Sequence, residues 1–339
     1  TMANASFFRF PQDTKNHGSI QGAENLRKNL RIIPYQFNLS AVWYTRHPLD
    51  RKEVFPMPSR SREAAASTKK KHRPSPLLWL LLVLVVAVGG YRLFTGYFPF
   101  QPRQSLDGQT ISRETLSQLR ELAKDETQAK YILKNLEDYP SGLLSLLARN
   151  TETLDFVAGY PQHKNDAPAD TVGEVTKGEF PLLMQWDMRW GYATYGDGLM
   201  ALNGCGPTAL SMVICGLTGD NTITPYTVAQ YADSQGYYVD GVGTSWDLMR
   251  TGAEHFGLTA KELPLDEGVI TRALKNGQPI ICSVGPGDFT TSGHFIVLVG
   301  IEDGQIRVND PNRHSTSSQL WDYDTLAGQI NNLWSYSLS

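Results

Sequence analysis

A single cysteine stands between two glycines, directly before a proline and an apolar run, within residues 203–213. The apolar side chains that follow recur at helical spacing, at Leu210, Val213, Ile214 and Leu217. Pro207 suits the first turn of a helix, so the pattern predicts a helix that begins at Cys205 and ends near Gly219. Unpaired N–H groups and the helix dipole favour a thiolate there. The stretch predicts either a nucleophile or a buried structural cysteine.

The cysteine count bears on this choice. The chain has three cysteines, at positions 205, 215 and 282. An odd number leaves at least one thiol unpaired within the chain, although a bridge between Cys215 and Cys282 stays open. The sequence has no CxxC pair and no HExxH motif, so we predict no metal site and no cofactor.

Charge is distributed unevenly along the 339 residues. The first 76 carry 14 Lys and Arg against five Asp and Glu, a net charge of +9, and the remainder carries −12. A basic run at 69–73 precedes the uninterrupted apolar run Leu77–Tyr91. This order predicts that residues 77–98 span a cell membrane once and anchor the chain there. The N-terminus would be cytoplasmic and the rest of the chain extracellular. The alternative is a signal peptide cleaved near Ala87-Val88-Gly89.

The N-terminal segment shows no folding pattern. We interpret residues 1–76 as a basic, mostly disordered cytoplasmic tail. Residues 1–56 are rich in aromatic side chains without any period, and Met57 begins a more typical tail, so our hypothesis is that 1–56 are a non-native extension. No basic patch interleaved with aromatics occurs, and we therefore predict no nucleic-acid binding.

Residues 110–161 have the pattern of a small helical module. Ser112 can cap a first helix, Tyr139-Pro140 ends a second, and Thr151 can cap a short fourth that Tyr160-Pro161 closes. The module could act as a spacer or dock a protein partner. A polar stretch without periodicity, 162–178, reads as a linker before the last domain, residues 179–339.

The last domain begins with helices and ends with strands. Cap and stop residues predict helices that begin at Thr224, at Thr244 or Ser245, and at Asp266. Strands are then predicted at Pro279–Val284, His294–Ile301, Gln305–Asn309 and near Leu333–Leu338. Helices first and antiparallel strands second indicate the α+β class.

A cysteine nucleophile needs a base within hydrogen-bond reach. The domain has three histidines, His255, His294 and His314. His294 begins the most hydrophobic strand and follows a glycine-rich loop, which would place its ring at the rim of the sheet. The alternative is a hydrogen-bonded structural histidine at a strand end.

The hairpin after that strand decides whether a carboxylate reaches His294. A three-residue loop at Glu302–Gly304 puts Asp310 opposite Ile296, on the same face as His294. A two-residue turn at Asp303-Gly304 would turn Asp310 to the other face. We expect the three-residue loop, with Asp310 as the group that orients the base.

Acyl transfer also needs donors for the developing oxyanion. The N–H of Cys205 is one candidate, and the side-chain amide of Gln185 is the second. Asn203 is closer in sequence, but the turn before Cys205 constrains it.

Four motifs in this order carry a resemblance: Gln185-Trp186-Asp187, Gly204-Cys205-Gly206-Pro207-Thr208, Gly293-His294-Phe295 and Asn309-Asp310-Pro311. Over residues 179–339 the chain resembles the C39-like peptidase family. These are papain-like cysteine peptidases related to the bacteriocin-processing domains of double-glycine exporters. The resemblance implies a papain-like fold, Cys205 as nucleophile, His294 as base, Asp310 as its orienting group and Gln185 as oxyanion donor. The sequence given holds no six-helix transporter and no nucleotide loop, so we do not carry over a double-glycine substrate.

We therefore predict a membrane-anchored extracellular cysteine peptidase that acts on peptides or proteins through a thioester. Gly243, Trp246 and Phe289 are the candidate substrate-binding residues, and turn or core roles are their alternative. A cell-wall amidase or transpeptidase on the same scaffold, or a non-catalytic surface binding module, are the competing functions.

Overall fold

The structure of the protein is a computed structural model that describes residues 75–94 and 103–339. Residues 1–74 of the predicted tail, which include the proposed extension 1–56, and residues 95–98 of the predicted anchor lie outside these ranges. The first helix, α1 (Pro76–Phe94), carries the apolar run, and its side chains from Leu77 to Val86 are exposed. Within the described ranges, no helix combines the length and apolar character needed to cross a membrane.

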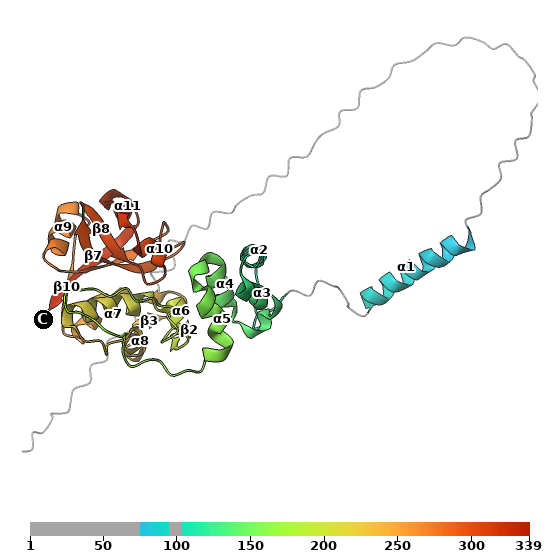
Figure 1. The fold of residues 1–339 in the computed structure, drawn as a ribbon, viewed down its shortest axis with the longest axis horizontal. Helices are drawn as coiled ribbons and strands as arrows, with labels where there is room; N and C mark the ends of the chain where they lie inside the picture. Colours follow the sequence, from blue (N-terminus) through green and yellow to red (C-terminus); the bar gives the residue numbers. More distant parts are fainter. Residues whose placement is uncertain (1–74, 95–102) are drawn as a thin grey trace, which may run out of the picture. The chain divides into compact units, whose positions relative to one another are not determined.

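The helical module contains four α-helices and two short 3-10 helices (Figure 1). They are α2 (Arg113–Leu122), α3 (Thr127–Lys134), η1 (Leu136–Asp138), α4 (Ser141–Arg149), η2 (Thr151–Thr153) and α5 (Leu154–His163). Ser112 caps α2 as predicted, since its hydroxyl accepts the N–H of Thr115. The prediction that Tyr160-Pro161 closes the last helix is wrong. Pro161 lies inside α5, in its final turn, where a missing N–H removes only one helical hydrogen bond.

The module shares a core with the domain that follows. Tyr192 stacks on Phe156 of α5 with ring centroids 4.3 Å apart, and its hydroxyl donates to the Phe156 carbonyl at 2.7 Å. Ala201 and Tyr192 are buried in the same cluster as the module's leucines. The stretch interpreted as a linker also packs on the domain, because Val172 is buried and its N–H donates to Asn221. The module is therefore in direct contact with the last domain.

The helices of the last domain follow the predicted caps at Thr224 and Asp266, whereas Thr244 lies in a strand and the helix after it begins at Leu248 without a side-chain cap. They are α6 (Met200–Asn203), α7 (Cys205–Thr218), α8 (Pro225–Ser234), the π-helix η3 (Leu248–Gly252), α9 (Glu267–Lys275), α10 (His314–Ser317) and α11 (Tyr323–Ala327). Helix α7 begins at Cys205 and ends at Thr218, and the next residue, Gly219, caps it in a left-handed conformation with φ of 79°. Thr224 and Asp266 cap α8 and α9 through their side chains, as predicted.

A six-stranded antiparallel sheet in the order β5-β10-β6-β7-β8-β9 forms the centre of the domain. The strands are β5 (Leu258–Glu262), β6 (Ile280–Val284), β7 (His294–Glu302), β8 (Gln305–Asn309), β9 (Leu320–Trp321) and β10 (Ile330–Leu338). Two short hairpins, β1 (Thr194–Tyr195) with β2 (Gly198–Leu199) and β3 (Tyr238–Val239) with β4 (Gly243–Thr244), lie outside it. Helices followed by a C-terminal antiparallel sheet confirm the predicted α+β class.

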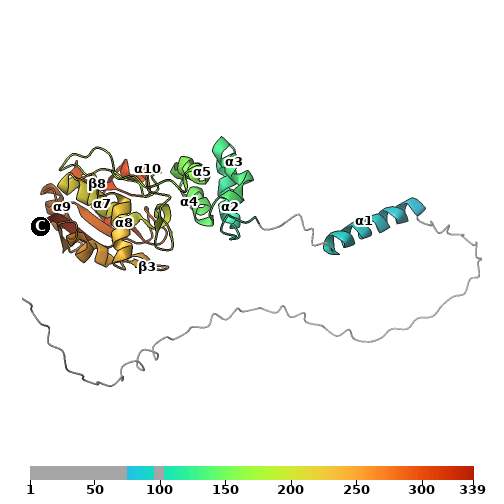
Figure 2. The ribbon, with the colours of Figure 1, turned by 90° about the horizontal axis from the view of Figure 1, so that it is seen from below.

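Alternate residues of the central strands face two different cores, so helices cover both faces of the sheet (Figures 1 and 2). Ile281 and Val297 pack in one core with α7 and α8, whereas Ile280 and Leu298 pack in the other with α9. All three cysteines are free. Cys215 and Cys282 belong to the two opposite cores, so the bridge left open by the sequence does not form.

The hairpin between β7 and β8 differs from the prediction. Glu302 pairs with Gln305, which makes the turn two residues long, with positive φ at both Asp303 and Gly304. A β-bulge between Leu298 and Gly300 then shifts the register by one residue. The expected loop length is therefore wrong, but the bulge restores the expected pairing for the last part of β8. Continued by one residue, this register puts Asp310 opposite Ile296.

Candidate active site

Cys205 is the first residue of α7 and lies at the wall of a cavity of about 690 Å³. The glycines on either side are required by close contacts. A Cβ at position 204 would come 2.5 Å from the carbonyl of Met200, and one at position 206 would come 2.8 Å from Thr244. The neighbours of the thiol thus carry no side chains, which leaves Cys205 only partly buried, whereas Cys215 and Cys282 are buried completely.

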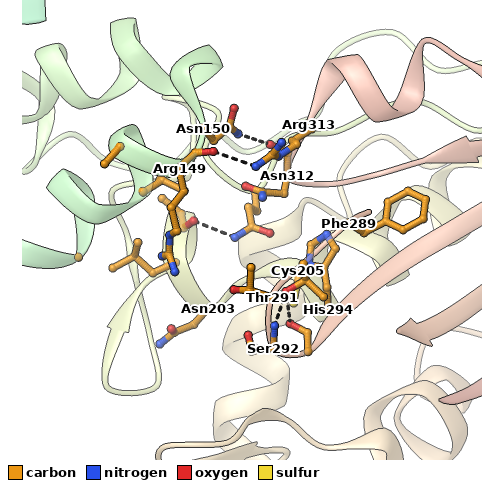
Figure 3. A pocket seen from close by; sticks show the side chains of 18 of the residues that line it. Arg149, Asn150, Asn203, Cys205, Phe289, Thr291, Ser292, His294, Asn312 and Arg313 are labelled. Carbon is orange, nitrogen blue, oxygen red and sulfur yellow. Dashed lines mark hydrogen bonds between the residues drawn. The ribbon is translucent and has the colours of Figure 1, made fainter. Parts of the chain in front are cut away.

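His294 and Asp310 form a buried pair beside Cys205. The Nε2 atom of His294 lies 2.7 Å from Oδ1 of Asp310, and the carboxylate is fully buried. His294 begins β7, as predicted, and Asp310 directly follows β8. Because Nε2 is engaged by the carboxylate, Nδ1 is the ring nitrogen left for the thiol, and Cys205 and His294 lie next to each other in the cavity (Figure 3).

The pKa of His294 reflects these contacts. Burial by itself lowers this pKa, because it penalises the charged ring. The negative charge of Asp310, and hydrogen bonds with Asp310 and Cys205, outweigh burial and raise the pKa to about 10. The imidazole therefore carries its proton at neutral pH.

Three residues that the sequence analysis did not identify hold Asp310. Thr316 donates its hydroxyl to Oδ2 at 2.6 Å, and the N–H of Asn312 donates to Oδ1 at 2.8 Å. The N–H of Asp310 itself donates to Ser317 Oγ at 2.9 Å. The bond from Asn312 is an Asx-type turn, for which Asp-Pro-Asn is a sequence signal. Nothing local in the sequence points to Thr316 or Ser317.

Gln185 lines the same cavity as Cys205 and His294. Its side-chain Nε2 donates to the carbonyl of Ala201 at 2.8 Å, and its backbone N–H donates to Pro311. The amide is therefore fixed between the segment before Cys205 and the loop after Asp310. Nε2 carries a second hydrogen, so the amide retains a donor for a substrate oxygen. Asn203, also at the cavity, donates instead to Tyr195, Asp197 and Tyr238.

The three candidate substrate-binding residues are placed differently. Phe289 lines the cavity and is buried. Trp246 and Gly243 do not line it. Trp246 donates to Ser283 Oγ and packs edge-on against Trp334, and Gly243 belongs to the hairpin of β3 and β4. The sequence analysis missed a wall formed by the helical module, to which Leu146 and Arg149 contribute.

The arrangement suits acyl transfer. The imidazole lies between a buried carboxylate, which it contacts, and a thiol in the same cavity wall, and an amide donor lines the same cavity. Within residues 75–94 and 103–339, no group of three or more His, Cys, Asp or Glu side chains is placed to hold a metal ion.

Comparison with known proteins identifies a family. Residues 177–337 match the model of the Peptidase_C39 like family. No curated protein matches the chain.

Three solved structures are similar over about half of this chain. The peptidase domain of Streptococcus ComA, a bifunctional ABC transporter in a quorum-sensing pathway, is 16% identical, with 48% of this chain and 100% of that chain covered and a TM-score of 0.34. A C39-like peptidase from Bacillus anthracis is 16% identical, with 49% and 98% covered and a TM-score of 0.28. A double-glycine motif protease from an AMS/PCAT transporter, in complex with the leader peptide, is 17% identical, with 49% and 98% covered and a TM-score of 0.30. By its family, the domain acts on a peptide or protein substrate. Residues 177–337 of this chain therefore form a cysteine peptidase domain of the Peptidase_C39 like family.

Proposed function

We propose that this domain hydrolyses peptide bonds with Cys205 as nucleophile, His294 as acid and base, and Asp310 as the group that orients His294. The observation that carries the proposal is the buried contact of 2.7 Å between His294 and Asp310 beside the thiol. The other two cysteines are buried in the cores and face no histidine–carboxylate pair among the described residues.

The reaction follows from the protonation of His294. The Cys205 thiolate attacks the peptide carbonyl, and the Cys205 N–H with the Gln185 amide stabilises the oxyanion. The proton on His294 Nδ1 passes to the leaving amine, which leaves a thioester on Sγ and a neutral ring. Nδ1 then takes a proton from water, whose oxygen attacks the thioester, and the acid product departs as the thiolate–imidazolium pair re-forms.

Product analysis tests this function. The full chain is incubated with a peptide library, with and without an added amine, and the products are identified by mass spectrometry. Hydrolysis gives free carboxylates that do not depend on the amine. New amides would indicate a transpeptidase. In parallel incubations, release of fragments from added cell wall would indicate an amidase, and products that are the same for wild type and Cys205→Ala would indicate a non-catalytic binding module.

Gln185→Ala is expected to lower kcat by about 10²- to 10³-fold, because one oxyanion donor is lost. KM should change little, since the donor acts mainly in the transition state. Steady-state kinetics with a peptide found in the library measure both, and Gln235→Ala, an exposed glutamine after α8, is the control. An unchanged kcat in the Gln185 variant would remove this residue from the mechanism.

We further propose that residues 77–98 anchor the domain to the cell membrane, with the N-terminus cytoplasmic and the domain outside. The basic run before the apolar segment and the exposed leucines and valines of α1 support this. The full chain should sediment with membranes and resist extraction by carbonate, and protease added outside intact cells should remove the domain. Recovery in the soluble fraction would contradict the anchor.

A further inference from the structure

The helical module contacts the loop that follows Asp310 through polar groups. Glu152, in η2, accepts the N–H of His314 at 2.6 Å and the N–H of Ser315 at 3.1 Å. Hydrogen bonds from the side chain and backbone of Ser315 and from the His314 N–H outweigh burial and lower the pKa of Glu152. Such charge-assisted bonds are stronger than those between neutral groups. One carboxylate of the module therefore holds two consecutive residues of the loop.

Two more bonds reach the residues just before them. The side-chain amide of Asn150, which is buried, donates to the Asn312 carbonyl at 2.7 Å, and the guanidinium of Arg313 donates to the Arg149 carbonyl at 2.8 Å (Figure 3). All of these contacts join residues 149–152 to residues 312–315. The polar contacts thus converge on a single loop.

The same loop fixes the catalytic carboxylate from its other side. Asn312 donates to Oδ1 of Asp310, Thr316 donates to Oδ2, and Ser317 accepts the Asp310 N–H. The module therefore holds the first residues of the segment 312–317. The same segment makes the hydrogen bonds to Asp310, apart from the bond between Asp310 and His294. A shift of this segment would move the carboxylate relative to the imidazole.

We propose that the helical module positions the Asp310 carboxylate, with Glu152 as the main positioning residue, so that the catalytic unit extends beyond residues 177–337. This inference rests on the proposed function of Asp310 and His294. A purely structural module needs only the shared apolar core around Tyr192 and Phe156. If the module positions Asp310, then weakening its contacts with residues 312–315 must also change the pKa of His294.

The test compares Glu152→Gln with the wild-type full chain. The amide keeps the size of the side chain but removes its charge, and we expect kcat to fall about 10-fold with KM unchanged, because small displacements of catalytic groups are costly. We also expect an NMR titration of the His294 ring to show a lower pKa, because the Asp310 charge that raises it is less well aligned. Glu152→Asp should recover part of both effects.

Glu126→Gln is the matched control. Glu126 is exposed on the same module, and its side chain does not cap α3. All variants are measured below their unfolding temperatures. If Glu152→Gln does not fold, Arg313→Ala serves as the substitute test. This variant removes the bond to Arg149 and should also lower the pKa of His294.

The outcomes separate the two proposals. A Glu152→Gln variant whose kcat and His294 titration match the control would overturn the positioning role, even if its melting temperature falls. If Asp310→Asn changes the titration and Glu152→Gln does not, the proposed function stands and the inference fails. If neither Asp310 nor Cys205 affects hydrolysis, the proposed function itself fails.

Discussion

Replacing Cys205 by alanine is expected to lower kcat/KM for peptide hydrolysis by about 10⁴-fold or more, because loss of a nucleophile leaves only binding and oxyanion stabilisation. The fold should be retained, since Cys205 is partly exposed at the first position of α7 and alanine is the best helix former. Steady-state kinetics with a peptide substrate measure the loss, and circular dichroism measures the fold.

The other two cysteines are the matched controls. Burial raises the pKa of the Cys215 thiol to about 11 and raises that of Cys282 as well, so neither thiol ionises near neutral pH. Cys215→Ala and Cys282→Ala should keep hydrolysis near the wild-type rate, apart from losses of stability caused by small cavities.

Covalent labelling can contradict the assignment of Cys205 as the nucleophile. A thiol-directed peptide electrophile should modify wild type and both control variants, but not Cys205→Ala. Equal labelling of Cys205→Ala, with Cys215 or Cys282 modified instead, would refute the assignment of the nucleophile.

Parts of the fold could be predicted because local chemistry determines them. Helix α7 begins and ends close to Pro207 and Gly219, as the sequence indicates. Alternating polar and apolar residues predict β8, Gln305–Asn309, and Pro311 lies just beyond its end. The edge strands β5 and β9 were missed because β5 is largely exposed and β9 has only two residues. Short or polar strands take their structure from pairing with neighbours, which no local pattern reports.

The hairpin shows how a wrong local prediction can give a correct register. Asp303-Gly304 supports a two-residue turn, which by itself would turn Asp310 away from His294. The bulge near Val299 compensates, and bulges have no strong sequence signal unless a glycine or proline marks them. Gly300, at the end of the bulge, is such a signal in this chain.

The support of the site depends on contacts between distant parts of the chain. Glu152 and Ser315 are separated by 163 positions, so no sequence period relates them. Cys205, His294 and Asp310 each follow a recognisable local pattern, whereas Thr316, Ser317 and Glu152, which support the Asp310 carboxylate or its loop, are defined only by tertiary packing.

Asp310→Asn is expected to lower kcat/KM by about 10³- to 10⁴-fold, as when the carboxylate of a catalytic triad becomes an amide. The amide keeps the shape of the side chain, but it carries no negative charge toward His294 Nε2. Its NH₂ group replaces either Oδ2, which accepts from Thr316, or Oδ1, which accepts from Asn312, so one of these bonds is lost. The pH profile of kcat/KM, recorded between pH 5 and about 11, tests the electrostatic part of this effect.

The direction of the pH shift follows from the balance at His294. In the wild type the Asp310 charge outweighs burial and holds the pKa at about 10, so the active imidazolium persists until the pH rises through that value. Without the charge, burial is left to lower the pKa, and the alkaline limb of the profile should move to lower pH. Asp303→Asn is the control, because Asp303 lies in the turn of the same hairpin with positive φ, which asparagine tolerates. An Asp310→Asn variant with full activity, or with an unmoved alkaline limb, would show that another group holds the proton on His294.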